Sequence, residues 1–188
     1  MNNLNRRTMI LVNMIMSMML LTSCNSTQYM KDYYNTNKNS LVEIRTSGVA
    51  LANSYDFQKI TIRKKSGELE LMFHGGSRNN VTMYLNPTSL NLISEHVVEG
   101  CSSDALQRYR TMYQSSALRL ILSRFEQISP KAIRISDGGI FVALGGTLKS
   151  ANPNLEGGIL MTMEPEVNNT RIVEQIDTNV YLYDDLIY

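Results

Sequence analysis

The chain has 188 residues, and its 18 basic and 17 acidic side chains give a formal net charge of +1. This balance gives no support for binding nucleic acid or anionic lipid headgroups through overall charge, because such binding needs a basic excess. The length suits one folded domain with a core large enough to need no disulfide or metal.

A short apolar run, from Thr8 to Leu21, follows Arg6 and Arg7 near the start of the chain. As a helix its 14 residues would measure about 21 Å, whereas the hydrocarbon core of a bilayer is about 30 Å thick. Asn13 interrupts the run, and the first acidic residue is Asp32. A basic start before a short apolar run is typical of an export signal, and a retained membrane anchor is the alternative.

The apolar run ends in Leu21-Thr22-Ser23-Cys24. This tetrapeptide resembles the lipobox of bacterial lipoprotein precursors, in which a small or hydroxylated pair precedes a cysteine that is acylated and becomes the first mature residue. The resemblance covers the signal region alone. It implies a lipoprotein signal peptide over residues 1–23 and a membrane anchor of several acyl chains on Cys24. It leaves 165 residues with 16 basic and 17 acidic side chains.

The resemblance also implies a location in the cell envelope. In enterobacterial lipoproteins an aspartate directly after the acylated cysteine tends to signal retention in the inner membrane, and Asn25 stands at that position here. We therefore expect the outer membrane, with the protein facing the periplasm.

Residues 25–40 are mostly Asn, Ser, Thr, Lys and Tyr. Because this composition shows no apolar period and cannot bury a core, it predicts a lipidated tether over residues 24–40. Sixteen flexible residues would reach about 20–24 Å. Docking of Tyr29, Tyr33 and Tyr34 on the membrane or on the domain is the alternative. Residues 41–188 are expected to form a single globular domain.

Alternating apolar and polar residues predict strands from residue 41 onward. In the first part of the domain the candidate strands are residues 41–45, 57–64, 68–73 and 81–85. The short turn Lys65-Ser66-Gly67 predicts a hairpin between the second and the third of them. Residues 88–99 fit either a strand or a short helix.

The longest periodic segment predicts one helix, which begins at the N-caps Ser102 and Ser103 and stops at Ser129-Pro130. Its apolar stripe consists of Leu106, Tyr109, Tyr113, Ala117, Leu120, Ile121 and Phe125. Four arginines lie mostly off the stripe, namely Arg108, Arg110, Arg119 and Arg124. We interpret them as a solvated helix face, and a phosphate-binding strip is the alternative.

Further strands are predicted after this helix. The candidates are residues 131–136, 140–144, 159–163, 167–177 and 179–183. Asp137-Gly138-Gly139 predicts a hairpin turn between the first two, because Asp-Gly between alternating runs is a strong hairpin signal. The pattern as a whole predicts an α+β fold, in which an antiparallel sheet meander packs against one long amphipathic helix.

Residues that could carry chemistry are few. His74 and His96 are the only histidines, and neither has a paired acid or thiol at metal-ligand spacing. His74-Gly75-Gly76 resembles the start of an esterase oxyanion loop, but no G-x-S-x-G motif follows, and a polar glycine turn explains it better. Glu68 and Glu70 are expected to be solvated opposite an apolar strand face. We predict no catalytic residue, cofactor or metal.

With Cys24 acylated, Cys101 is the one remaining thiol and no internal disulfide can form. We predict that Cys101 is buried and structural, because no activating basic neighbour stands beside it in the sequence. Intermolecular pairing and nucleophilic catalysis are the alternatives.

These observations favour a protein without enzymatic activity that binds another envelope component as an accessory or assembly factor. The expected partners are a membrane, through the lipid on Cys24, and an envelope protein. We expect no nucleic-acid partner. A periplasmic carrier of an apolar ligand is the second interpretation. A hydrolase with an unrecognised site is the third.

Overall fold

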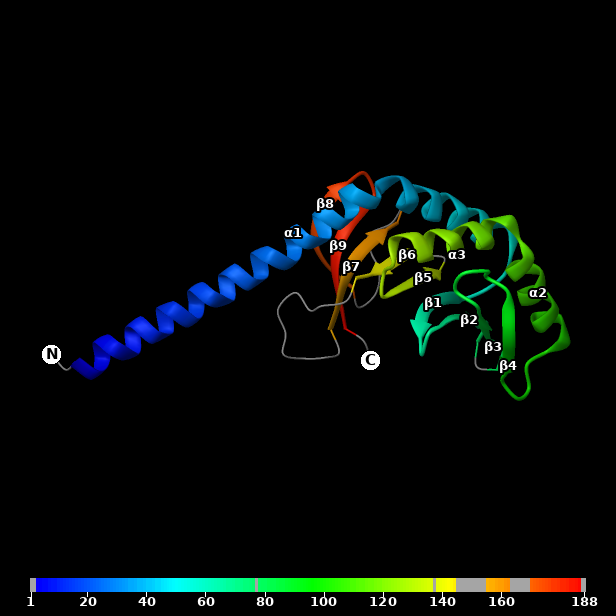
Figure 1. Cartoon of the computed structure of the whole chain (residues 1–188), viewed down its shortest axis with the longest axis horizontal. Helices are drawn as coiled ribbons and strands as arrows, with labels where there is room; N and C mark the ends of the chain where they lie inside the picture. Colours follow the sequence, from blue (N-terminus) through cyan, green and yellow to red (C-terminus); the bar gives the residue numbers. More distant parts are fainter. Residues whose placement is uncertain (1–2, 77, 137, 145–154, 163–169, 187–188) are drawn as a thin grey trace.

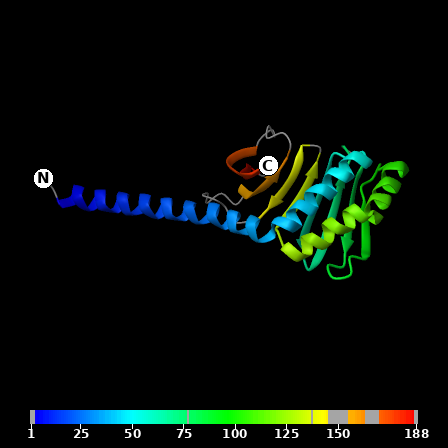
Figure 2. The same ribbon diagram turned by 90° about the horizontal axis from the view of Figure 1, so that it is seen from above.

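The computed structural model describes residues 3–76, 78–136, 138–144, 155–162 and 170–186, with side chains for 27–76, 78–136, 138–144, 157–162 and 172–183. Within these residues three helices lie over one face of a nine-stranded antiparallel sheet (Figures 1 and 2). The predicted fold class, α+β with an antiparallel sheet and a long helix packed on it, is confirmed.

The sheet has the strand order β4-β3-β2-β1-β5-β6-β7-β9-β8, and every neighbouring pair is antiparallel. The strands are β1 (Lys59–Lys65), β2 (Glu68–His74), β3 (Asn80–Leu85), β4 (Leu92–Val97), β5 (Ala132–Ser136), β6 (Gly139–Ala143), β7 (Leu155–Met161), β8 (Thr170–Asp177) and β9 (Val180–Leu186). Both predicted hairpins are present. Ser66 and Gly67 have the positive φ values that a two-residue hairpin turn requires.

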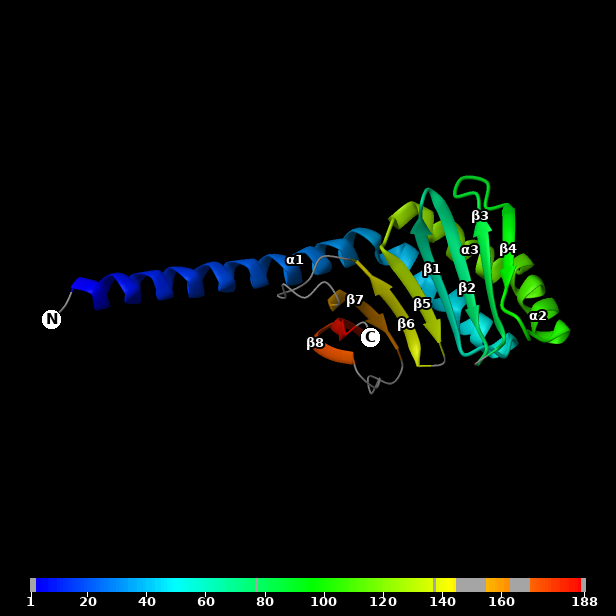
Figure 3. The same ribbon diagram turned by 90° about the horizontal axis from the view of Figure 1, so that it is seen from below.

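The main core lies between the sheet and the helices. In β6, Ile140 and Val142 belong to this core, whereas Phe141 between them points to the opposite face. There it forms a second, smaller cluster with Leu160 and Tyr183. The C-terminal strands therefore bury side chains on both faces, and Figure 3 shows how they curl away from the plane of β1–β5.

Helix α1 (Asn3–Ser54) is the long helix of the fold. Figure 1 shows its first half extending away from the sheet and its second half lying across it. The prediction of a flexible tether is wrong for residues 27–40, because Met30 and Tyr34 are buried in the main core. The hydroxyl of Tyr33 also donates a hydrogen bond to the carbonyl oxygen of Ile128, at 2.9 Å.

The strand predicted over residues 41–45 is also wrong, since these residues continue α1. Leu41 and Ile44 are buried at helical spacing, and Leu51 continues the same stripe two turns later. Among the described helices, none is both long and apolar enough to cross a membrane.

The helix predicted between Ser102 and Ser129 is divided into α2 (Ser103–Gln114) and α3 (Ser116–Ile128). Ser115 separates them in an extended conformation. Its amide and hydroxyl both donate to the carbonyl oxygen of Met112, and its hydroxyl accepts a hydrogen bond from the amide of Leu118. One serine thus ends α2 and caps α3, because serine is a strong N-cap residue.

The break at Ser115 changes which residues face the core. The buried residues of the two helices are Ala105, Tyr109, Met112, Leu118, Ile121, Leu122, Phe125 and Ile128. Leu120, predicted to be in the apolar stripe, is only partly buried, and Leu122 takes the core position.

The four arginines of α2 and α3 connect these helices to the rest of the fold. Arg108, Arg110 and Arg124 form ion pairs with Asp56, Glu95 and Glu43, respectively. Arg119 donates to the carbonyl oxygen of Leu90 and lies over the ring of Tyr113. Their partners belong to different elements, so the arginines form separate contacts and not one strip.

Candidate functional site

The predicted lipid attachment residue, Cys24, lies within α1. Its side chain is outside the side chains that the structure describes. Acylation at this position therefore stays a prediction from the sequence.

Cys101 is a free thiol that lies directly before α2. It packs against the main core but is only partly buried. Its Sγ donates to the carbonyl oxygen of Ser102, at 3.7 Å. The prediction of a fully buried cysteine is thus wrong in degree, because the loop that carries it stays at the surface.

The two histidines lie on different strands. His74 on β2 pairs with Asn80, and His96 on β4 pairs with Thr82. Burial, with a smaller effect of the nearby Lys59, lowers the pKa of His74. In the described part of the chain, no three His, Cys, Asp or Glu side chains gather into a possible metal site.

The segment after His74 is a packed glycine turn. The amide of Gly75 and the hydroxyl of Tyr109 both donate to the carbonyl oxygen of Asn79, at 2.9 and 3.0 Å. A Cβ on residue 75 would lie 2.0 Å from the Tyr109 oxygen. Glycine is therefore required by the close approach of α2, as the interpretation as a turn predicts.

Glu70 departs from the sequence prediction. It is only 2% exposed, although it points away from the helices. Arg63 on the neighbouring strand donates to it through Nε, and the Lys65 Nζ lies 3.7 Å from its other oxygen. The prediction of a solvated Glu70 is wrong because these long basic side chains cover it.

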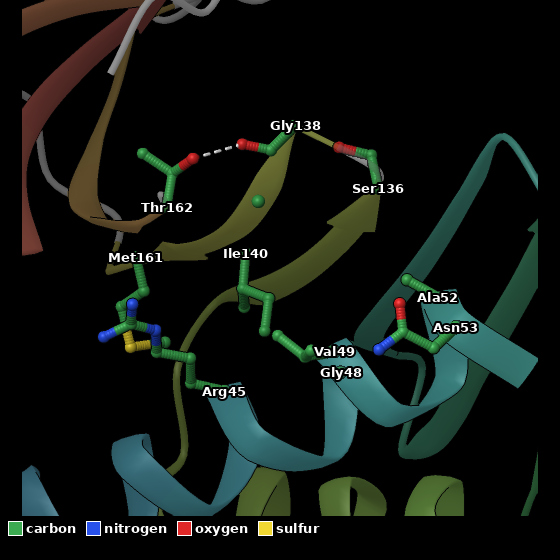
Figure 4. A pocket seen from close by; sticks show the side chains of 11 residues that line it. Arg45, Gly48, Val49, Ala52, Asn53, Ser136, Gly138, Ile140, Met161 and Thr162 are labelled. Carbon is green, nitrogen blue, oxygen red and sulfur yellow. Dashed lines mark hydrogen bonds between the residues drawn. The ribbon is translucent and has the colours of Figure 1, made fainter. Parts of the chain in front are cut away.

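A cleft lies between α1 and the strand ends of β5, β6 and β7 (Figure 4). We call it the α1 groove, and its volume is about 300 Å³. It is lined by Arg45, Gly48, Val49, Ala52, Asn53, Ser136, Gly138, Gly139, Ile140, Met161 and Thr162. The lining is mixed: four residues carry apolar side chains, four carry polar or charged ones, and three are glycines.

Two local features shape the α1 groove. Gly48 brings α1 close to the sheet, since a Cβ there would lie 2.4 Å from Cδ1 of Ile140. On the opposite wall the Thr162 hydroxyl donates to the carbonyl oxygen of Gly138, at 2.6 Å, and fixes the turn between β5 and β6 against the end of β7. Figure 4 shows Ile140 pointing toward Gly48, and Arg45 beside Met161.

A second hollow of about 250 Å³ continues the groove along α1 and shares Arg45 and Met161 with it. At its far end, Tyr34 and Lys38 donate to one carboxylate oxygen of Asp177, at 2.8 and 2.6 Å. These contacts tie α1 to the turn between β8 and β9. The hydrogen bonds from Lys38 and Tyr34 hold the pKa of the Asp177 carboxyl well below its usual value of 3.8.

Replacing Asp177 with asparagine should lower the melting temperature at neutral pH. Because the pKa of Asp177 is lowered on folding, its contribution to stability is complete above 3.8 and is lost as the pH falls through the lower value of the folded state. Thermal unfolding of Asp177→Asn and of wild type should therefore differ at neutral pH and converge in acid. Asp32→Asn, an exposed change on α1, serves as the control. A gap that persists unchanged in acid would contradict the assignment.

Two valines of α1 stand beside this groove. Val42 and Val49 are 50% and 49% exposed, lie seven residues apart, and line the second hollow and the α1 groove, respectively. The groove is not apparent from the sequence, whose alternating pattern predicts a strand over residues 41–45, where α1 runs. The signal that could have revealed it is the helical spacing of Leu41, Ile44 and Leu51.

Comparison of the chain with protein-family models, with curated proteins and with solved structures gives no match, so the interpretation of the site rests on the residues described above.

Proposed function

We propose that the protein is a lipid-anchored component of a bacterial cell envelope, on the outer membrane and facing the periplasm, and that it binds another envelope protein through the α1 groove. The basic start, the short apolar run and the lipobox-like Leu21-Thr22-Ser23-Cys24 support the anchor.

The observation that carries the proposed binding role is the exposed pair Val42 and Val49 beside the groove. Residues seven apart lie on the same side of a helix, so the two valines form an apolar strip along α1, with Arg45 between them. Lys38, which is paired with Asp177, lies farther along the same helix. Exposed apolar side chains beside polar groups suit the apolar face of a partner helix.

A carrier of an apolar ligand is the second candidate. The floor that Gly48, Ile140 and Met161 form in the α1 groove favours it. A volume of about 300 Å³ is at the low end for ligand pockets, which measure roughly 300–1,000 Å³. The groove would thus hold a small ligand, or one side chain of a protein partner.

Co-purification of tagged full-length chains from membranes tests the proposed function. Cys24→Ser should yield an uncleaved precursor without lipid, visible by mass. The double variant Val42→Asp/Val49→Asp should be processed and folded normally yet lose the partner protein, because two charges interrupt the apolar strip. Val98→Asp, at an exposed valine directly after the edge strand β4 and outside the lining of both hollows beside α1, is the matched control and should keep the partner.

Two results would contradict the proposal. Normal processing and acylation of Cys24→Ser would contradict the lipid anchor on Cys24. Wild-type levels of partner on the double valine variant would show that the groove is not the binding surface. Loss of a bound small molecule, with no protein lost, would favour the carrier.

A further inference from the structure

A third hollow, of different character, lies at the ends of β1 and β5. Its volume is about 460 Å³. It is lined by Thr61, Arg63, Lys64, Lys65, Lys131, Ala132 and Arg134. Five of these seven residues are basic, in a chain with almost equal numbers of basic and acidic side chains. We call it the basic hollow.

Strand register brings the two arginines of the basic hollow together. In the ladder between β1 and β5, Thr61 pairs with Arg134, and Arg63 pairs with Ala132. Arg63 and Arg134 are therefore diagonal neighbours on the same face, roughly 7–8 Å apart at the backbone. The small side chains of Thr61 and Ala132 on the other diagonal leave the space between them open. Figure 3 shows this face of β1–β5 without a described helix across it.

The buried Glu70 orients one side of the hollow. It accepts a hydrogen bond from Nε of Arg63. Among the described residues, the two terminal amino groups of that guanidinium have no hydrogen-bond partner. Lys65 is the second cation near Glu70, and its side chain is 59% exposed. Arg63 is thus held at its inner nitrogen, with its outer nitrogens available to a ligand.

The remaining basic side chains add positive charge at the rim. Lys64 pairs with Glu126 across the end of α3, at 2.7 Å, and Lys131 and Arg134 have contacts of their own. Like charges on neighbouring strands repel, Glu70 and Glu126 offset part of this repulsion, and an anion between the cations would offset more of it. A guanidinium with two free parallel donors matches the oxygens of a phosphate group.

We propose that the basic hollow is an anion site that binds a phosphate group, with Arg63 as the bidentate donor and Lys65 as a second contact. The phosphate belongs either to an anionic lipid headgroup or to a soluble phosphate compound. The headgroup source rests on the proposed function, since it requires the anchor on Cys24. The near-neutral charge of the whole chain gave no indication of this site, because only the pairing of β1 with β5 brings Arg63, Lys64 and Lys65 beside Lys131 and Arg134.

Titration of the full chain with inorganic phosphate, in zwitterionic detergent at low ionic strength, tests the site by calorimetry. Lys65→Ala should weaken binding about three- to tenfold, the usual effect of losing one charged contact. Lys59→Ala removes the same charge from the same face of β1 outside the hollow, and it should have no effect. Arg63→Met combined with Glu70→Met should abolish binding without leaving a buried carboxylate unpaired.

A second measurement distinguishes the two sources of phosphate. The full chain is placed in bilayer discs of zwitterionic lipid, with either anionic phospholipid or inorganic phosphate added, and lysine acylation is followed by mass spectrometry. If acylation of Lys65 is slowed relative to Lys59 in the discs with anionic phospholipid, the bound phosphate belongs to a lipid headgroup. If it is slowed only in the discs with inorganic phosphate, the bound phosphate belongs to a soluble compound. No phosphate binding and no protection, or equal effects of the two lysine variants, would overturn the proposal. A chain that fails to enter the discs would contradict the anchor alone, because the detergent titration does not need it.

Discussion

Leu122→Asp should unfold the domain at ambient temperature. Leu122 is fully buried in α3, and a carboxylate there would have neither water nor a basic partner. Burial of an unpaired charge costs several kcal/mol, which is comparable with the total stability of about 5–15 kcal/mol of a typical domain. Circular dichroism and urea unfolding of the full chain would measure this loss.

Leu120→Asp is the matched control for Leu122→Asp. It makes the same change two residues away on the same helix, at a side chain that is only partly buried. The charge can reach water there, so we expect a loss of about 1 kcal/mol. Equal urea midpoints for the two variants would show that the core-facing side of α3 is assigned wrongly.

Gly158→Ala should destabilise the domain nearly as much as Leu122→Asp, although it adds only one methyl group. A Cβ on Gly158 would lie 2.1 Å from the carbonyl oxygen of Val142 on the neighbouring strand. Backbone cannot move aside as a side chain can, so β6 and β7 would have to separate. We expect a cost of about 3 kcal/mol, the upper range for overpacking, and a fall in Tm of roughly 6–12 °C.

Gly48→Ala provides the comparison for this substitution. The nearest atom to its new Cβ, at 2.4 Å, would be the end of the flexible Ile140 side chain. Alanine also favours a helix over glycine by about 1 kcal/mol, which offsets the cost of moving Ile140. The melting temperature should change little. A larger fall for Gly48→Ala than for Gly158→Ala would contradict this account.

The strands could be predicted because their signals are local. Ile60 and Ile62 alternate with polar residues, and the pair Ser66-Gly67 supplies the two positive φ values of the turn. Burial of one face and turn chemistry are both visible within about ten residues of sequence. For this reason the α+β class and the hairpins followed from the sequence alone.

The helices were harder because tertiary contacts decide them. Among the described side chains of residues 27–40, the buried apolar ones are Met30 and Tyr34, and apart from these two only Ser40 is buried. Their contacts with distant elements stabilise a helix that local composition does not favour. Conversely, the periodic stripe of α2 and α3 continues across Ser115, whose hydroxyl nevertheless ends one helix and begins the next.

Neither candidate site could be found from sequence spacing. The α1 groove needs Gly48 beside Ile140, which are 92 positions apart. The basic hollow needs the register that sets Arg63 diagonally from Arg134. Pairing between distant strands, and not local periodicity, creates both surfaces.

With Cys24 acylated, as we propose, the continuity of α1 would fix the orientation of the domain at the membrane. Among the described side chains, the first core residue, Met30, follows Cys24 by six residues, or about 9 Å along the helix. Each residue added or removed in this interval would change the height of the domain by about 1.5 Å and turn the α1 groove by about 100° around the helix axis. Under the proposed anchoring, the number of residues in this interval would therefore determine which side of the domain faces the lipid and which side a partner can approach.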